Sequence, residues 1–63
     1  MYHCEFDDIK QDHIFWYRGK KYRKQTCWLD NYDTMRSTLQ YNAIRIEDNH
    51  KMLFAGDTIV FYQ

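Results

Sequence analysis

The sequence predicts a mainly β fold: a small antiparallel barrel of five strands, SH3-like or OB-like, with one short helix as an optional addition. Three observations predict it. The 63 residues suffice for one domain, residues 1–63, with a thin core. Six tyrosines, four phenylalanines and two tryptophans favour strands and supply large rings for burial. Turn-forming residues separate the apolar runs. An open antiparallel sheet crossed by one helix is the alternative.

The first twelve residues are acidic, with four carboxylates against the single Lys10. Phe6 and Ile9 lie three positions apart, a spacing that places both on one side of a short helical turn. We therefore expect a turn of helix that packs these two side chains inward. A solvated turn without a packing role is the alternative interpretation.

Residues 13–27 are expected to form a β-hairpin. The run HIFWY is β-branched and aromatic, and Gly19-Lys20 offers a two-residue loop with glycine first, as a type II′ turn requires. This loop sets three cross-strand pairs, which are Tyr17–Tyr22, Phe15–Lys24 and Trp16–Arg23.

Alternation along the hairpin separates an inward face of rings from an outward face of charges. The inward face carries His13, Phe15, Tyr17, Tyr22, Lys24 and Thr26, and the outward face carries Ile14, Trp16, Arg18, Lys21, Arg23 and Gln25. Lys24 is the exception on the inward face. We expect its ammonium to reach the sheet edge or to find a carboxylate.

Residues 28–40 show apolar positions near helical spacing, and Asp33 or Thr34 suits an N-cap. This pattern predicts a short helix or an irregular crossing of the sheet. A second β region then follows, in residues 41–63.

Residues 41–63 read as a β-meander. The run YNAIRIE alternates, and two segments have turn chemistry, Asp48-Asn49-His50 and Gly56-Asp57. We expect Leu53 and Val60 to point inward.

A spacing pattern runs through most of the chain. Two aromatic residues precede Gly19 at four and two positions, and a tyrosine and a lysine follow it at three and five. These are Phe15, Tyr17, Tyr22 and Lys24, preceded by Phe6-x-x-Ile9 and followed by Ala43, Phe54 and Asp57-Thr58-x-Val60. The pattern resembles a loose group of small bacteriophage and prophage-encoded proteins of unknown function, from which the segment Cys27–Gln40 departs. The resemblance implies a viral accessory protein made in a host cytoplasm, and it implies no reaction.

Several functional classes are disfavoured. No apolar stretch is long enough for a membrane helix, and the acidic start MYHCEFDD lacks the apolar region of a signal peptide. Two cysteines are expected as reduced thiols in the cytoplasm. The candidate metal ligands lack ligand spacing; they are His3, Cys4, His13, Cys27 and His50. So small a chain leaves little room for a sequestered site, and nothing in the sequence places Cys27, a histidine and an aspartate together. We therefore expect no enzyme, no metal and no cofactor.

Binding is the remaining class. The segment Arg18–Lys24 holds five of the nine cations and no acid, and Trp16 lies beside it in the predicted hairpin. Such a face suits phosphates and stacked bases, although a cation–π pair between Trp16 and Arg23 explains it without a ligand. Aromatic residues beyond the needs of a core favour a protein interface or a homodimer. The candidate binding residues are Trp16, Arg18, Lys21, Arg23, Trp28 and Tyr32.

The functional expectation is a small phage-type accessory protein that binds a host protein stoichiometrically and inhibits or modulates it. A nucleic-acid-binding module that uses the basic aromatic hairpin face is the first alternative. A minor virion or assembly component is the second.

Overall fold

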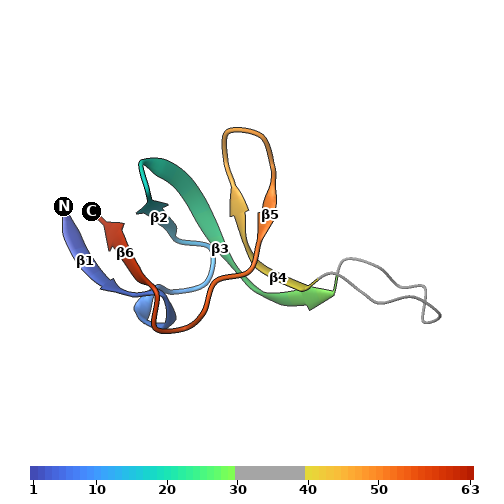
Figure 1. The fold of residues 1–63 in the computed structure, drawn as a ribbon, viewed down its shortest axis with the longest axis horizontal. Coiled ribbons are helices and arrows are strands. Elements are labelled where there is room, and N and C mark those ends of the chain that lie inside the picture. The colour runs from blue at the N-terminus through green and yellow to red at the C-terminus, as the bar shows by residue number, and fades with distance from the viewer. Residues whose placement is uncertain (30–39) are drawn as a thin grey trace.

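The computed structural model describes the backbone of residues 1–29 and 40–63 and the side chains of residues 1–25 and 41–63. It contains one antiparallel sheet with the strand order β1-β6-β2-β3-β4-β5 (Figure 1). The elements are β1 (Tyr2–Glu5), a 3₁₀ turn η1 (Phe6–Asp8), β2 (Ile14–Tyr17), β3 (Lys20–Leu29), β4 (Gln40–Arg45), β5 (Lys51–Met52) and β6 (Ile59–Tyr62). The prediction of a mainly β, antiparallel fold is confirmed.

The sheet differs from the expected five-stranded barrel in strand number and in closure. Within the described residues it has six strands and is not closed, because β1 and β5 do not pair with each other. The strand that the sequence analysis did not predict is β1. It pairs with β6, with Tyr2 opposite Tyr62, so both ends of the described chain lie side by side (Figure 1).

The β2–β3 hairpin confirms the predicted faces but not the predicted loop. Tyr17 lies opposite Lys20, so the two-residue loop is Arg18-Gly19 rather than Gly19-Lys20. Both loop residues have positive φ, 51° and 78°, as a type I′ turn requires. Phe15 consequently faces Tyr22, and Trp16 faces Lys21. The pairing has moved by two positions along β3, and a shift of two leaves every side chain on its original face.

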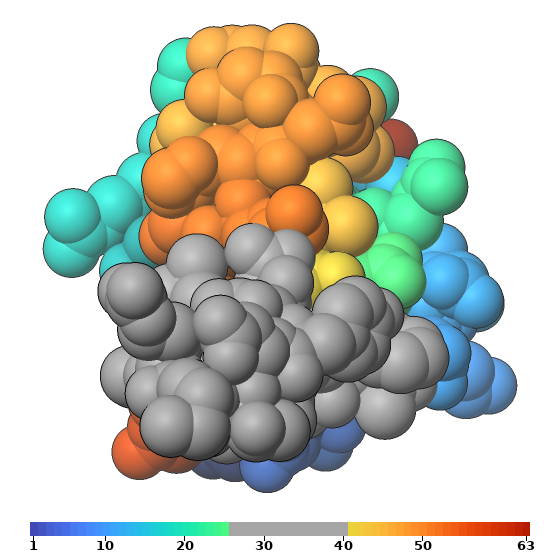
Figure 2. All heavy atoms as spheres, turned by 90° about the vertical axis from the view of Figure 1, so that its right-hand side faces the viewer, coloured from blue at the N-terminus to red at the C-terminus, as the bar shows by residue number. Residues whose placement is uncertain are grey.

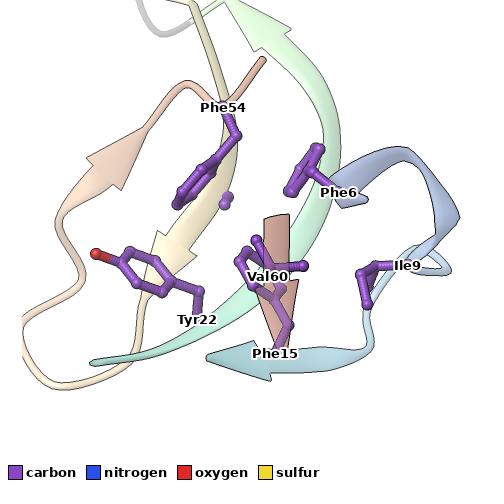
Figure 3. Packing of buried hydrophobic residues seen from close by; sticks show 7 residues of the cluster. Phe6, Ile9, Phe15, Tyr22, Phe54 and Val60 are labelled. Atoms are coloured by element: carbon purple, nitrogen blue, oxygen red, sulfur yellow. The ribbon is translucent and has the colours of Figure 1, made fainter. Parts of the chain in front are cut away.

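Seven residues form the buried core: Phe6, Ile9, Phe15, Tyr22, Ala43, Phe54 and Val60 (Figure 3). Phe54 is central, because its ring lies 5.1–5.4 Å, centroid to centroid, from four other rings. One of these contacts, with Phe6, is stacked, and the other three are edge-on. Edge-on and offset arrangements are the favoured geometries of aromatic pairs. Rings therefore close a core that has few aliphatic side chains.

The short N-terminal turn has the expected packing role. Phe6 and Ile9 are both buried, at the start of η1 and just after its end. Lys24 reaches this turn from β3. Its ammonium donates hydrogen bonds to the carbonyl oxygens of Phe6 and Ile9, at 3.0 and 2.6 Å, and lies 4.5 Å from the centre of the Phe6 ring. Lys24 thus finds backbone carbonyls and a ring, rather than the carboxylate that was one of the two expectations.

The C-terminal meander corrects one core assignment. Val60 is buried as predicted, but Leu53 is 56% exposed and Phe54 takes the inward position. The reason is the pairing of β5 with β4. Met52 lies opposite the buried Ala43 and shares its face, so alternation turns the side chain of Leu53 outward. The predicted turns are present at both sites. In the first turn, the N–H of Arg45 donates to the carbonyl of His50, and the N–H of Asn49 donates to the carbonyl of Arg45. In the second, the N–H of Thr58 donates to the carbonyl of Ala55.

The segment 28–40 was predicted as a short helix or a crossing. Its two ends belong to strands, since Trp28 and Leu29 lie in β3 and Gln40 lies in β4. The rest of this prediction, including the N-cap at Asp33 or Thr34, lies outside the described residues.

Candidate binding face

One side of the sheet faces the core, and the opposite side, here called the outer face, faces solvent. Residues directly opposite each other on neighbouring strands share a face. The core side therefore contains Phe15 and Tyr22, and the outer face contains Trp16 and Lys21. This division is the one that alternation predicts from the sequence.

A row of rings crosses the outer face. His3 lies opposite Phe61, and Phe61 lies opposite Trp16, so the row spans β1, β6 and β2. The centroids of the His3 and Phe61 rings are 6.2 Å apart, in an edge-on arrangement. Phe61 is 42% exposed, and Trp16 is half-buried. We call His3, Phe61 and Trp16 the aromatic row.

Three cations continue from the aromatic row. Lys21 is the direct partner of Trp16 on β3, and its ammonium lies 5.6 Å from the centre of the indole. Arg18, in the hairpin loop, has its guanidinium carbon 5.4 Å from the centre of the Tyr17 ring. Arg23 is exposed and lies opposite Ile44 of β4. We call Arg18, Lys21 and Arg23 the basic flank. The indole is thus paired with Lys21, where the sequence analysis expected Arg23.

The other two cations of the segment Arg18–Lys24 have intramolecular partners. Lys24 is held by backbone carbonyls, and Lys20 forms an exposed ion pair with Glu47 at 3.1 Å. Figure 2 shows the β4–β5 hairpin, in orange, close to turquoise atoms from the region of the β2–β3 turn, which agrees with this ion pair. Among the described residues, no carboxylate forms an ion pair with the basic flank.

The acidic N-terminal segment does not neutralise the basic flank. Asp7 and Asp8 lie in η1, which Figure 1 places at the end of the sheet opposite the β2–β3 turn. The other described ion pair joins Arg45 and Asp48 within the β4–β5 hairpin, at 2.8 Å. Within the part of the chain that the structure describes, the acids of η1 and the cations of the basic flank therefore lie in different regions of the surface. Glu5 shares the outer face with the aromatic row, because it follows His3 by two positions on the edge strand β1.

Of the six residues predicted to bind a partner, the structure brings together Trp16, Lys21 and Arg23 on the outer face, with Arg18 at its border. Trp28 is in β3, but its side chain lies outside the described set, as does all of Tyr32. The sequence analysis did not select His3 and Phe61. The outward position of Phe61 was predictable by alternation, since Phe61 directly follows the inward Val60. Its contact with Trp16 was not predictable, because it depends on the order of the strands in the sheet.

A hollow near the chain ends contains the thiol of Cys4, with His13 and Tyr62 also in its lining. Burial raises the pKa of this thiol, and the nearby Asp8 carboxylate raises it further. A neutral thiol is a poor nucleophile, so the hollow does not favour covalent chemistry. In the described part of the chain, no group of three metal-ligating side chains is close enough to hold an ion.

Comparisons of this chain with protein-family models, with curated proteins and with solved structures give no match.

Proposed function

We propose that this chain acts by stoichiometric binding through its outer face rather than by catalysis, and that single-stranded nucleic acid is the partner that this face fits best. The observation that supports the proposal most is the alignment of Phe61 and Trp16 on adjoining strands, with Lys21 directly beside them. Rings on a sheet surface can stack with successive unpaired bases, and neighbouring cations can bind the phosphates.

The spacing of the sheet supports this mode of binding. Neighbouring β-strands are about 4.8 Å apart, so Phe61 and Trp16 present two adjacent rings, one for each of two bases of a single-stranded nucleic acid. In sites of this kind, each stacked base contributes about 1–3 kcal/mol to the binding free energy, with little dependence on which base it is. The exposed fraction of Phe61 leaves it accessible for such a contact.

The arrangement of charge also supports it. A chain with nine cations and nine acids has no general attraction for nucleic acid. Among the described residues, the basic flank nevertheless forms no ion pair, while Lys20 and Lys24 are held by Glu47 and by backbone carbonyls. We therefore expect binding to be local and sensitive to salt, with no more than three or so phosphates contacted.

A protein partner is the second candidate, and a separate observation favours it. Ile46, Ile59 and Phe61 are 40%, 49% and 42% exposed, and apolar surface of this kind suits a protein interface. In this form, the chain would be a phage-type accessory protein in a host cytoplasm, and its outer face would occlude a site on a host protein. A homodimer or a minor assembly component would use the same apolar surface. No helix among the described residues is long and apolar enough to cross a membrane.

Fluorescence anisotropy with a labelled 15-nucleotide single strand, measured over a salt series, tests the proposal. Three phosphate contacts predict a slope of log K against log salt of about −2. Replacing Arg18, Lys21 and Arg23 together by alanine should weaken binding and flatten this slope, while the control Lys10→Ala should leave both unchanged. Trp16→Leu should weaken binding at every salt concentration, and Tyr2→Leu is its matched control.

An affinity that does not depend on salt, or that survives the triple replacement, would overturn the nucleic-acid proposal. Capture from a host lysate on the wild-type chain, compared with the Phe61→Ala and Ile59→Ala variants, would then test the protein partner. A protein retained by wild type and lost by both variants would support the second candidate.

A further inference from the structure

A second feature of the outer face is a shallow hollow beside the basic flank. It has a volume of about 180 Å³ and is lined by Arg23, Gln25, Ile44, Ile46 and Asn49. Arg23 and Ile44 are direct partners across β3 and β4, and the backbone N–H of Ile46 donates to the carbonyl of Lys21 at 2.9 Å. Arg23 follows Lys21 by two positions on β3, so the hollow lies on the same side of the sheet as the aromatic row.

The lining combines aliphatic side chains with residues that carry amide groups. Ile44 and Ile46 supply aliphatic surface, and Gln25 and Asn49 each supply an amide with two N–H donors and one carbonyl acceptor. Within the described residues, no hydrogen bond engages the side chains of Gln25, Asn49 or Arg23. Their hydrogen-bonding groups are thus available to a ligand.

The size of the hollow limits the ligand. Sites that enclose a drug-sized molecule usually measure about 300–1,000 Å³, so 180 Å³ suits one flat group rather than a whole nucleotide. Aliphatic lining residues favour the face of an unsaturated ring, and amide-bearing residues favour a ring whose edge carries both donors and acceptors. A nucleobase has both properties.

We propose that this hollow takes one splayed-out base of a bound single strand and prefers adenine, an inference that rests on the proposed function. Asparagine and glutamine amides pair with the N6 and N7 groups of adenine, donating to N7 and accepting from N6. The guanidinium of Arg23 holds the phosphate that flanks this base. The aromatic row supplies affinity without sequence preference, and the hollow adds preference at one position.

The test uses 12-nucleotide single strands of thymine in which one central base is thymine, adenine, cytosine or guanine. Wild type should bind the adenine-containing strand about five-fold or more tightly than the all-thymine strand. Gln25→Leu and Asn49→Gly should remove this preference and keep the all-thymine affinity within about two-fold. Glycine is chosen because Asn49 has a φ of 60°, which glycine adopts without strain. Gln11→Leu, at an exposed position outside the hollow, is the matched control and should retain the preference.

Three outcomes would overturn the inference, and they differ in what they say about the proposed function. Equal affinity for all four strands, with the expected salt slope, would overturn the hollow as a base site and leave the proposed function standing. A preference for adenine that persists in both variants would have the same meaning. Failure to bind any strand at low salt, with a host protein captured instead, would overturn both. Circular dichroism of each variant checks that a loss of preference is not a loss of fold.

Discussion

The side-chain amide of Asn42 forms two hydrogen bonds with the backbone of Phe54. Its nitrogen donates to the Phe54 carbonyl at 3.0 Å, and its oxygen accepts from the Phe54 N–H at 2.8 Å. The regular pairing of β4 with β5 extends from Ile44–Lys51 to Ala43–Met52, so the amide continues the hydrogen bonding after the strand ends. This contact holds the central ring of the core in place from β4.

Asn42→Ala should lower the free energy of unfolding by about 2 kcal/mol, because it leaves a partly buried N–H and C=O without their partners. Urea denaturation followed by tryptophan fluorescence measures the change. Asn49→Gly is the matched control, since the Asn49 side chain makes no hydrogen bond among the described residues, and it should change stability by only a few tenths of a kcal/mol. A similar loss in both variants would contradict the role assigned to Asn42.

Lys24 gives a second prediction, in comparison with Lys20. Lys24→Met keeps the aliphatic stem but removes the ammonium that binds the carbonyls of Phe6 and Ile9, so it should cost about 1–2 kcal/mol. Lys20→Met breaks only the exposed ion pair with Glu47 and should cost less than about 1 kcal/mol. Thermal denaturation of the two variants, side by side, measures the difference. If Lys20→Met proved the more harmful, Lys24 would not be what ties β3 to the N-terminal turn.

The sequence predicts the faces of the hairpin better than its pairing. Alternation from Phe15 to Tyr17 depends on strand geometry alone, which is why both rings face the core as expected. The loop, in contrast, was placed by the preference for glycine at its first position. The structure instead accepts Arg18 at positive φ to obtain a type I′ turn, whose twist matches that of the strands. A single-residue preference was outweighed by the fit between turn and sheet.

Long-range pairing explains the features that the sequence did not predict. β1 has only four residues, and it is recognisable as a strand only beside β6. The same pairing of distant segments brings Phe61 next to Trp16, so two of the three rings of the aromatic row come from terminal strands. The ammonium of Lys24 binds backbone carbonyls because η1 packs near β3, and these contacts join residues 15 and 18 positions apart in the sequence. The sequence analysis placed Arg18, Lys21 and Arg23 together on the outward face of the hairpin. The strand pairing puts Lys21 and Arg23 there, but Arg18 lies in the loop.

Phe54 and Phe61 allow a comparison of two phenylalanines in one small domain. Phe54→Leu should lower the free energy of unfolding by about 1–2 kcal/mol, because leucine fills only part of the space among four rings. Phe61→Leu, on the outer face, should lower it by about 0.5 kcal/mol or less, but should weaken oligonucleotide binding. Urea denaturation and anisotropy on the same samples measure both properties. Equal stability losses would contradict the division into a core side and an outer face.

The pairing of Asp48 with Arg45 makes stability depend on pH in the acid range. The Arg45 guanidinium donates two hydrogen bonds to this carboxylate, at 2.9 and 2.8 Å, and holds its pKa at about 2, below the ordinary value of 3.8. A pKa that is lower in the folded state means that the charged carboxylate favours folding. Its contribution to stability is complete above the ordinary pKa and disappears as the pH falls towards 2.

Asp48→Asn should therefore be less stable than wild type at pH 6, and the difference should shrink between pH 4 and pH 2. Urea denaturation at a series of pH values measures this, and in an Arg45→Met background the same replacement should show a much weaker dependence. A difference that stays constant from pH 6 to pH 2 would mean that the ion pair does not contribute to folding.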